Sequence, residues 1–128
     1  MQFGYTIVYV PDVESTMVFY KNAFSPEEHF LHESKQYGEP NTGNTKIAFA
    51  SNSLAQSNGV NFIENNTQNT APGIEIAFIA EDVKQVYQHA ISQGAITVKA
   101  PSTKPWGQEV AYLRDINGII VELCSPMG

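Results

Sequence analysis

The sequence predicts an α+β fold made of two similar modules, each with a strand, a helix and then two or three further strands. The first observation is an internal repeat: residues 7–13 align with residues 77–83 at an offset of 70, and both segments run from an apolar strand into an Asp-Val helix start. The second is that residues 47–49 align with residues 121–123 at an offset of 74. The matching order of these segments indicates a duplicated unit.

Each repeat contains a predicted amphipathic helix that begins at an aspartate. Asp82 is a favourable N-cap, Gln85 three positions later completes the pattern of a capping box, and Asp12 takes the same place in the first repeat. Behind these caps, apolar side chains recur at helical spacing. The two apolar faces are formed by Val13, Met17, Tyr20 and Phe24, and by Val83, Val86, Tyr87, Ala90 and Ile91.

The remaining strands and the domain limits follow from turn residues. Asn117-Gly118 is the strongest hairpin signal in the chain, and it predicts antiparallel strands over residues 109–114 and 119–124. Residues 52–73 are polar and rich in asparagine, which favours a linker or long surface loop. We expect one domain over residues 1–128, with module one at about 1–52, a linker at about 53–72 and module two at about 73–128.

Composition excludes several classes of protein. Thirteen acidic residues against seven basic ones give a net charge of −6, which argues against nucleic-acid binding. No apolar run approaches the roughly 18 residues that a membrane span needs. The single cysteine, Cys124, cannot form an internal disulfide. The first residues lack the pattern of a secretion signal, so we expect a cytoplasmic protein without nucleic-acid or membrane partners.

Four segments spread over nearly the whole chain together resemble one known superfamily. They are Val10-x-Asp12-Val13 with Phe19-Tyr20, Glu75-Ile76-Ala77-Phe78 with Asp82-Val83, Pro105-Trp106-Gly107-Gln108, and Asp115-Ile116-Asn117-Gly118-x-x-x-Glu122-Leu123. This pattern resembles the vicinal oxygen chelate superfamily of glyoxalases, bleomycin-resistance proteins and extradiol dioxygenases. The resemblance implies two βαβββ modules whose strands form a curved, cup-like mixed sheet, the glyoxalase/bleomycin-resistance fold.

The resemblance also implies a metal site on the floor of the cup, with ligand positions at Tyr5, Ala48, Glu75 and Glu122. Only Glu122 is the usual residue, and an alanine cannot coordinate a metal. Two carboxylates and a phenol make a poor zinc site, whereas magnesium or manganese would accept these oxygens but bind weakly. We therefore expect no tightly bound cofactor, with a weak divalent metal at Glu75 and Glu122 as the alternative.

The expected pocket combines strand alternation with the resemblance. Alternation predicts an aromatic and apolar face that carries two carboxylates. By resemblance, Tyr112 takes the place of a pocket tyrosine of the extradiol dioxygenases, and Trp106 lies on a rim loop. Cys124 is expected to be an inert thiol, because Glu122 nearby would raise its pKa. The expected ligand-binding residues are Tyr5, Ile7, Tyr9, Ala48, Glu75, Trp106, Tyr112, Glu122 and Cys124.

Two glutamates on one sheltered face cannot both stay ionised without compensation. Either one of them has a raised pKa, or Lys46 or a cationic ligand neutralises them. Aromatic rings beside carboxylates would suit an aromatic or cationic molecule.

Two functions of different classes fit this pattern. The first is a non-catalytic small-molecule or drug-binding protein similar to bleomycin-resistance proteins, because the fold pattern is kept while the metal set is largely lost. The alternative is a metal-dependent lyase, isomerase or dioxygenase of the glyoxalase type that uses Glu75 and Glu122; its catalytic residues cannot be assigned. We also expect a homodimer, since the superfamily commonly pairs chains and cyclic dimers are the commonest oligomers.

Overall fold

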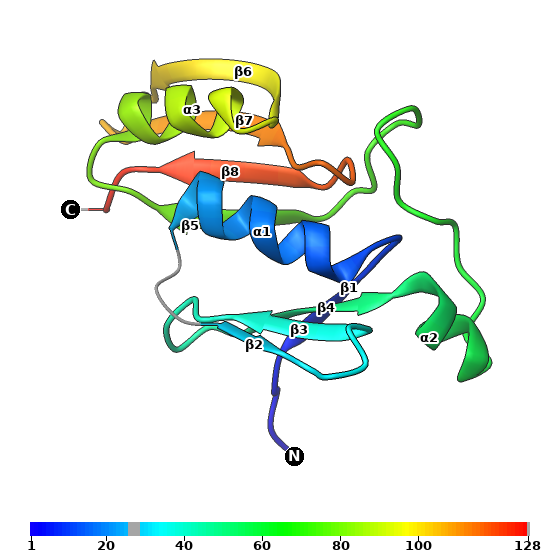
Figure 1. Ribbon diagram of the computed structural model, residues 1–128. Helices are drawn as coiled ribbons and strands as arrows, with labels where there is room; N and C mark the ends of the chain where they lie inside the picture. The colour runs from blue at the N-terminus through cyan, green and yellow to red at the C-terminus, as the bar shows by residue number, and fades with distance from the viewer. Residues whose placement is uncertain (26–28, 128) are drawn as a thin grey trace. The chain divides into compact units, whose positions relative to one another are not determined.

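The computed structural model describes residues 1–25 and 29–127, and the chain divides into two compact units (Figure 1). Unit 1 is Met1–Asn65 and unit 2 is Asn66–Gly128. Each unit contains one open, four-stranded mixed sheet with helices, which confirms the α+β fold class. Within the described part of the chain, none of the helices has the length and apolar character needed to cross a membrane.

Unit 1 has the order strand, helix and three strands, followed by one more helix. The sheet order is β1-β4-β3-β2, with β1 and β4 parallel and the other pairs antiparallel. The elements are β1 (Thr6–Val10), α1 (Val13–Phe24), β2 (His29–Leu31), β3 (Tyr37–Pro40), β4 (Ile47–Ser51) and α2 (Asn52–Ser57).

Unit 2 repeats this topology with the sheet order β5-β8-β7-β6, and β5 and β8 form its parallel pair. The elements are β5 (Glu75–Ile79), α3 (Val83–Ser92), β6 (Ile96–Thr103), β7 (Glu109–Arg114) and β8 (Ile120–Cys124). The repeats at offsets 70 and 74 thus correspond to strands in equivalent positions of the two sheets. Both units are βαβββ modules, as expected.

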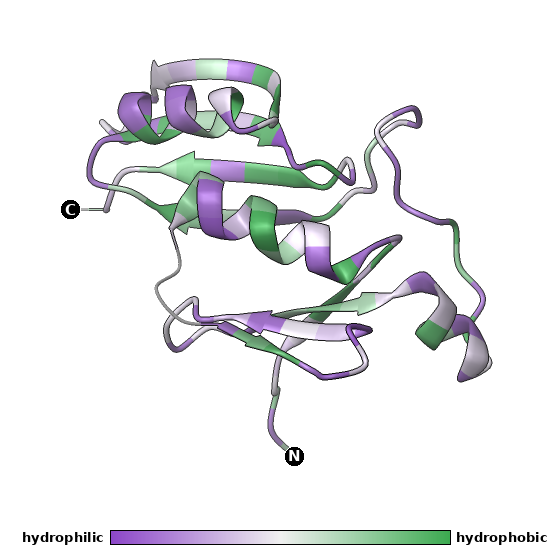
Figure 2. Cartoon of the chain, viewed as in Figure 1, coloured by the Kyte–Doolittle hydropathy of each residue, from purple (hydrophilic) through white to green (hydrophobic). Residues whose placement is uncertain are grey.

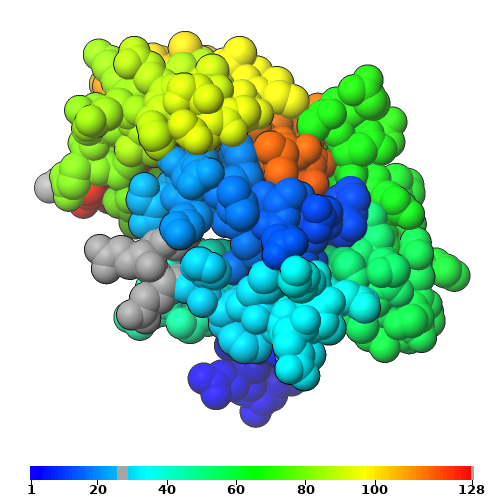
Figure 3. All heavy atoms as spheres, viewed as in Figure 1, coloured from blue at the N-terminus to red at the C-terminus, as the bar shows by residue number. Residues whose placement is uncertain are grey.

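Helix α1 covers one face of the sheet of unit 1, so the other face is left for the candidate site residues. Tyr20 is only 1% exposed, and its ring packs on Phe49 of β4 with centroids 4.8 Å apart. A side chain at Gly38 would collide with Met17, since a Cβ there would lie 2.9 Å from the Met17 sulfur. Figure 3 shows the atoms of α1 lying against those of the β2–β3 hairpin.

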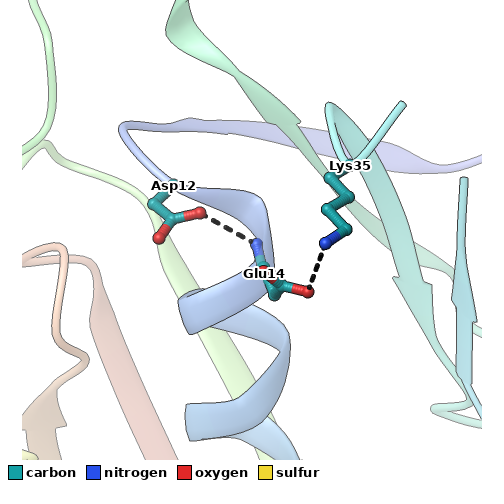
Figure 4. A network of polar contacts seen from close by, with 3 residues as sticks. All are labelled: Asp12, Glu14 and Lys35. Atoms are coloured by element: carbon teal, nitrogen blue, oxygen red, sulfur yellow. Dashed lines mark hydrogen bonds and ion pairs between the residues drawn. The ribbon is translucent and has the colours of Figure 1, made fainter. Parts of the chain in front are cut away.

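The start of α1 is fixed by side chains, as the sequence predicts. The Asp12 carboxylate accepts a hydrogen bond from the Glu14 backbone N–H at 3.2 Å (Figure 4). Glu14 also pairs with Lys35, at 3.5 Å, on the turn between β2 and β3. Because both side chains are largely exposed, this ion pair adds little stability.

In unit 2, α3 covers the sheet face that carries the fully buried Val121 and Leu123. Asp82 accepts a hydrogen bond from the Gln85 N–H at 3.1 Å, which confirms it as the N-cap. Asp115 is completely buried, and its carboxylate accepts hydrogen bonds from the N–H groups of Asn117 and Ile119, at 2.8 and 3.0 Å. These bonds fix the predicted hairpin between β7 and β8.

The expected linker is more structured than the sequence suggests. Residues 52–57 form helix α2, capped by the Ser51 hydroxyl, which accepts a hydrogen bond from the Leu54 N–H at 3.1 Å. Beyond it, the Phe62 ring packs on Tyr9 with centroids 4.7 Å apart, and the Asn65 side-chain amide donates to the Tyr9 carbonyl at 3.1 Å. The first part of this segment therefore belongs to unit 1.

Candidate functional site

The candidate site of unit 2 lies on the sheet face opposite the side chains that α3 covers. Strand β8 is mostly apolar with one hydrophilic band (Figure 2), and its only charged residue is Glu122. Glu122 pairs with Ala77 of β5 on one side and with Tyr112 of β7 on the other. Paired residues of adjacent strands point to the same face. Tyr112, Ala77 and Glu122 therefore face the same side of the sheet, with a small side chain next to the carboxylate.

Glu75 and Glu122 are neighbouring carboxyl groups on this face. The pKa of Glu75 is raised, first by loss of hydration, then by interaction of its side chain with Glu122 and by the negative charge of Glu122. This direction fits the first of the two alternatives drawn from the sequence, in which one of the two glutamates has a raised pKa.

Tyr112 is the second group bound to Glu122. The hydrogen bond to Glu122 is the largest cause that raises the pKa of Tyr112, followed by burial and by the charge of Glu122. A neutral phenol donates its proton to the carboxylate, and an anion at Tyr112 would be repelled by it. The Glu122 carboxylate therefore favours the neutral forms of both Tyr112 and Glu75.

Cys124 lies on the same face as Glu122, two residues further along β8. Its thiol approaches the Phe78 carbonyl oxygen at 3.7 Å. Burial, a hydrogen bond to Glu122 and the Glu122 charge raise the pKa of the Cys124 thiol. A nucleophilic thiol needs the opposite shift. The direction of this shift fits the inert thiol expected from the sequence.

Trp106 is held on the turn between β6 and β7 by a short chain of hydrogen bonds. Its indole N–H donates to the Gln108 side-chain oxygen at 2.9 Å, and the Gln108 amide donates to the Ser125 carbonyl at 2.8 Å. The indole is 62% exposed. Trp106 is thus tethered to the residue that follows Cys124, at one end of β8.

The other expected site residues lie on unit 1. Ile7 pairs with Ala48 in the β1–β4 ladder, and Tyr9 lies on the same face as Ile7. Tyr9 is partly covered by Phe62, while Tyr5 and Ile7 remain 48% and 43% exposed. The structure therefore gathers Glu75, Tyr112, Glu122 and Cys124 on one sheet and Tyr5, Ile7, Tyr9 and Ala48 on the other.

Two polar residues of β3 that the sequence analysis missed lie on this face of unit 1. The Tyr37 phenol lies close to Tyr5 and to the Glu39 carboxylate, and both raise its pKa. Gly38 and Pro40 alternate with them in the same short strand, and glycine and proline are poor strand formers that hide its pattern. The alternation Tyr-x-Glu is the sequence signal that could have identified these two residues. It lies shortly before β4, the strand that the internal repeat aligns with β8.

The donor set of unit 2 does not fit a tightly bound divalent metal. Among residues 1–25 and 29–127, no three histidine, cysteine, aspartate or glutamate side chains come together to hold a metal ion. On the sheet of unit 2 the oxygen donors beside each other are the carboxylates of Glu75 and Glu122 and the Tyr112 phenol. Magnesium and manganese prefer six oxygen ligands, and catalytic zinc prefers three protein ligands.

The duplicated βαβββ topology and the place of Glu122 on the last strand define a protein of the vicinal oxygen chelate class. The family model described as a glyoxalase-like domain matches residues 3–128, and the chain belongs to this family. The resemblance drawn from the sequence is thereby confirmed. Among proteins with curated functions, no significant match is found.

Solved structures show the same fold. The chain is similar to a glyoxalase-related enzyme from Fulvimarina pelagi, with TM-score 0.77, 14% identity, and coverage of 98% of this chain and 89% of that one. A glyoxalase/bleomycin resistance protein/dioxygenase from Nocardioides gives TM-score 0.74, 14% identity, and coverage of 99% and 85%. A superfamily member from Sphaerobacter thermophilus gives TM-score 0.66, 20% identity, and coverage of 98% and 99%.

Proposed function

We propose that this protein binds an organic small molecule on the sheet face of unit 2, as a binding protein similar in kind to bleomycin-resistance proteins. The observation that carries the proposal is the surroundings of Glu122: Tyr112 and Glu75 lie beside its carboxylate, and it raises the pKa of both. The ligand class is an aromatic or cationic molecule.

The chemistry of the face supports a protonated amine with an apolar body. The Glu75–Glu122 pair provides negative charge, which an ammonium group would balance. Tyr112 offers an aromatic ring beside that charge, and Ile79 on β5 is 74% exposed. The methyl group of Ala77 leaves space next to the carboxylate. An amine could donate N–H groups to Glu122 while its apolar part covers Ile79.

Calorimetric titration with 2-phenylethylammonium and with neutral 2-phenylethanol tests the proposal. We expect saturable binding of the cation, with the alcohol weaker by about tenfold, because a hydrogen bond to a charged group is lost. Glu122→Gln should weaken cation binding by about tenfold as well. Glu109→Gln is the matched control, because Glu109 lies at the start of β7 on the alternate face.

The results that would overturn the proposal are equally specific. One is the lack of saturable binding of either compound up to about 10 mM, a range that covers affinities down to millimolar. The other is equal weakening by Glu122→Gln and Glu109→Gln, which would assign the effect to overall charge and not to the site.

A metal-dependent lyase, isomerase or dioxygenase of the glyoxalase type is the second candidate function. One observation favours it: Glu122 keeps the position that the superfamily resemblance gives to the last metal ligand, and Glu75 lies beside it. Elemental analysis for bound metal after extensive dialysis separates the two candidates.

Two further expectations stay predictions. A homodimer would show a mass of twice 14.1 kDa in light scattering, and a mass that stays at 14.1 kDa at all accessible concentrations would end that claim. The cytoplasmic location expected from the sequence is the other prediction.

A further inference from the structure

The free face of unit 1 carries a carboxylate among aromatic rings. Phe30 of β2 pairs directly with Glu39 of β3, so their side chains leave the sheet side by side. Tyr37 precedes Glu39 by two residues and points to the same face. Tyr5 reaches the cluster from the residue before β1, since its hydroxyl contacts that of Tyr37.

Tyr37 lies close to both Tyr5 and Glu39. Burial, the Glu39 charge and Tyr5 together raise the pKa of Tyr37 to about 12. Tyr37 therefore remains a neutral phenol at physiological pH. Its ring and the Glu39 carboxylate lie side by side on this face.

The exposed surface of this cluster is provided by its rings. Gly38 pairs with Phe49, so Glu39 falls beside Ala48, which is itself fully buried. Phe30 is 52% exposed and Tyr5 is 48% exposed, which leaves ring surface available to a solute. Lys46 lies two residues before Ala48, and alternation places it on the same face. Its positive charge would repel a cationic ligand.

We propose that Tyr5, Phe30, Tyr37 and Glu39 form a binding site for a quaternary ammonium group. Such a cation has no N–H to donate, so it relies on ring faces and on a nearby negative charge, which are the two features gathered here. The site lies on unit 1 and goes beyond the proposed function, which concerns unit 2.

Choline and its neutral isostere 3,3-dimethyl-1-butanol provide a matched pair of probes for the full chain. We expect saturable binding of choline, measured by calorimetry or by changes in its methyl proton resonance, and weaker binding of the alcohol by about three- to tenfold. Phe30→Leu keeps the apolar side chain but removes the ring, and Glu39→Gln keeps an oxygen acceptor but removes the charge. Each should weaken choline by about three- to tenfold.

Two further variants locate the effect. Lys46→Gln should strengthen choline binding, because it removes a competing positive charge from the same face. Glu122→Gln, on unit 2, should leave choline binding unchanged. Circular dichroism of each variant shows that the fold is retained.

The inference is overturned by equal binding of choline and the alcohol, or by the lack of saturable choline binding up to about 50 mM, far above a millimolar affinity. Loss of choline binding in Glu122→Gln but not in Glu39→Gln also overturns it, and would instead support the site on unit 2. Failure of phenylethylammonium to bind, with choline binding intact, would remove the proposed function alone.

Discussion

Tyr112 lies directly opposite Glu122 across strands β7 and β8, and the Glu122 side chain raises the pKa of its phenol. Glu75 approaches the same carboxylate from β5. Three ionisable groups from three adjacent strands therefore act as one unit, and a change in any of them is expected to alter the other two.

Replacement of Glu122 by glutamine should lower the pKa of Tyr112, because the variant lacks the charge that opposes phenolate formation. Titration of tyrosine ring carbons by NMR, with Tyr112 assigned, measures this shift. Glu109→Gln should leave the Tyr112 pKa unchanged. A Tyr112 pKa that stays constant or rises in Glu122→Gln would show that the hydrogen bond does not form.

Replacement of Glu75 by glutamine should make the variant increasingly stable relative to the wild type as pH rises. The native state raises the pKa of Glu75, so it holds this proton more tightly than the unfolded chain does. The free energy of unfolding of the wild type therefore falls as pH rises from about 4.3 through the native pKa, whereas glutamine does not titrate. Urea unfolding between about pH 4 and pH 8 should show that the free energy of unfolding of the variant increases relative to that of the wild type. A constant difference would contradict the raised pKa.

Replacement of Gly118 by alanine should destabilise unit 2 for two reasons. Gly118 has φ of 90°, and a Cβ there would lie 2.5 Å from both the Arg114 guanidinium and the Asn66 carbonyl. Arg114 also donates to the carbonyls of Gly118 and Asn69, both at distances below 3 Å. We expect a loss of about 3 kcal/mol in the free energy of unfolding.

Gly43→Ala is the control for this steric effect. Gly43 has a similar φ of 89° but nothing within 4 Å of a Cβ, so its variant should lose only about 1 kcal/mol. Equal losses in the two variants would attribute the whole effect to backbone strain and leave no role for the Arg114 contact.

Metal removal should change neither stability nor binding. The two carboxylates and one phenol of unit 2 offer too few donors for a tight site. After extensive dialysis, elemental analysis should find no stoichiometric divalent metal, and chelator should leave the melting temperature and phenylethylammonium binding unchanged. Retained metal that is lost in Glu122→Gln would favour the glyoxalase-type enzyme.

The fold was predictable where local signals and the repeat agreed. Asp12 and Asp82 each cap a helix after an apolar strand, and Asn117-Gly118 marks the hairpin, so these elements appear where the pattern places them. Helix α2 was missed because its asparagine- and serine-rich sequence resembles a loop, and only the Ser51 cap and its packing identify it.

The candidate site was predictable in part. Strand alternation and the superfamily resemblance place Glu75 and Glu122 on one face. Tyr112 lies beside Glu122 on the neighbouring strand of the same sheet. The Tyr37–Glu39 cluster could not be predicted from the sequence for two reasons. Its strand contains Gly38 and Pro40, and the residues beside it on β4 depend on the register of the two strands. Cross-strand pairing joins residues that are far apart in the chain, and a single sequence does not show which residues pair.

A titration of the isotope-labelled protein with 2-phenylethylammonium, followed by amide chemical shifts, is the most direct test of a ligand site around Glu122. We expect saturable shifts concentrated at Glu75, Ala77, Tyr112 and Glu122. These shifts should be lost in Glu122→Gln but not in Glu109→Gln. Shifts concentrated on α3 or on unit 1, or no saturable shift at any of these residues, would contradict a ligand site built around Glu122.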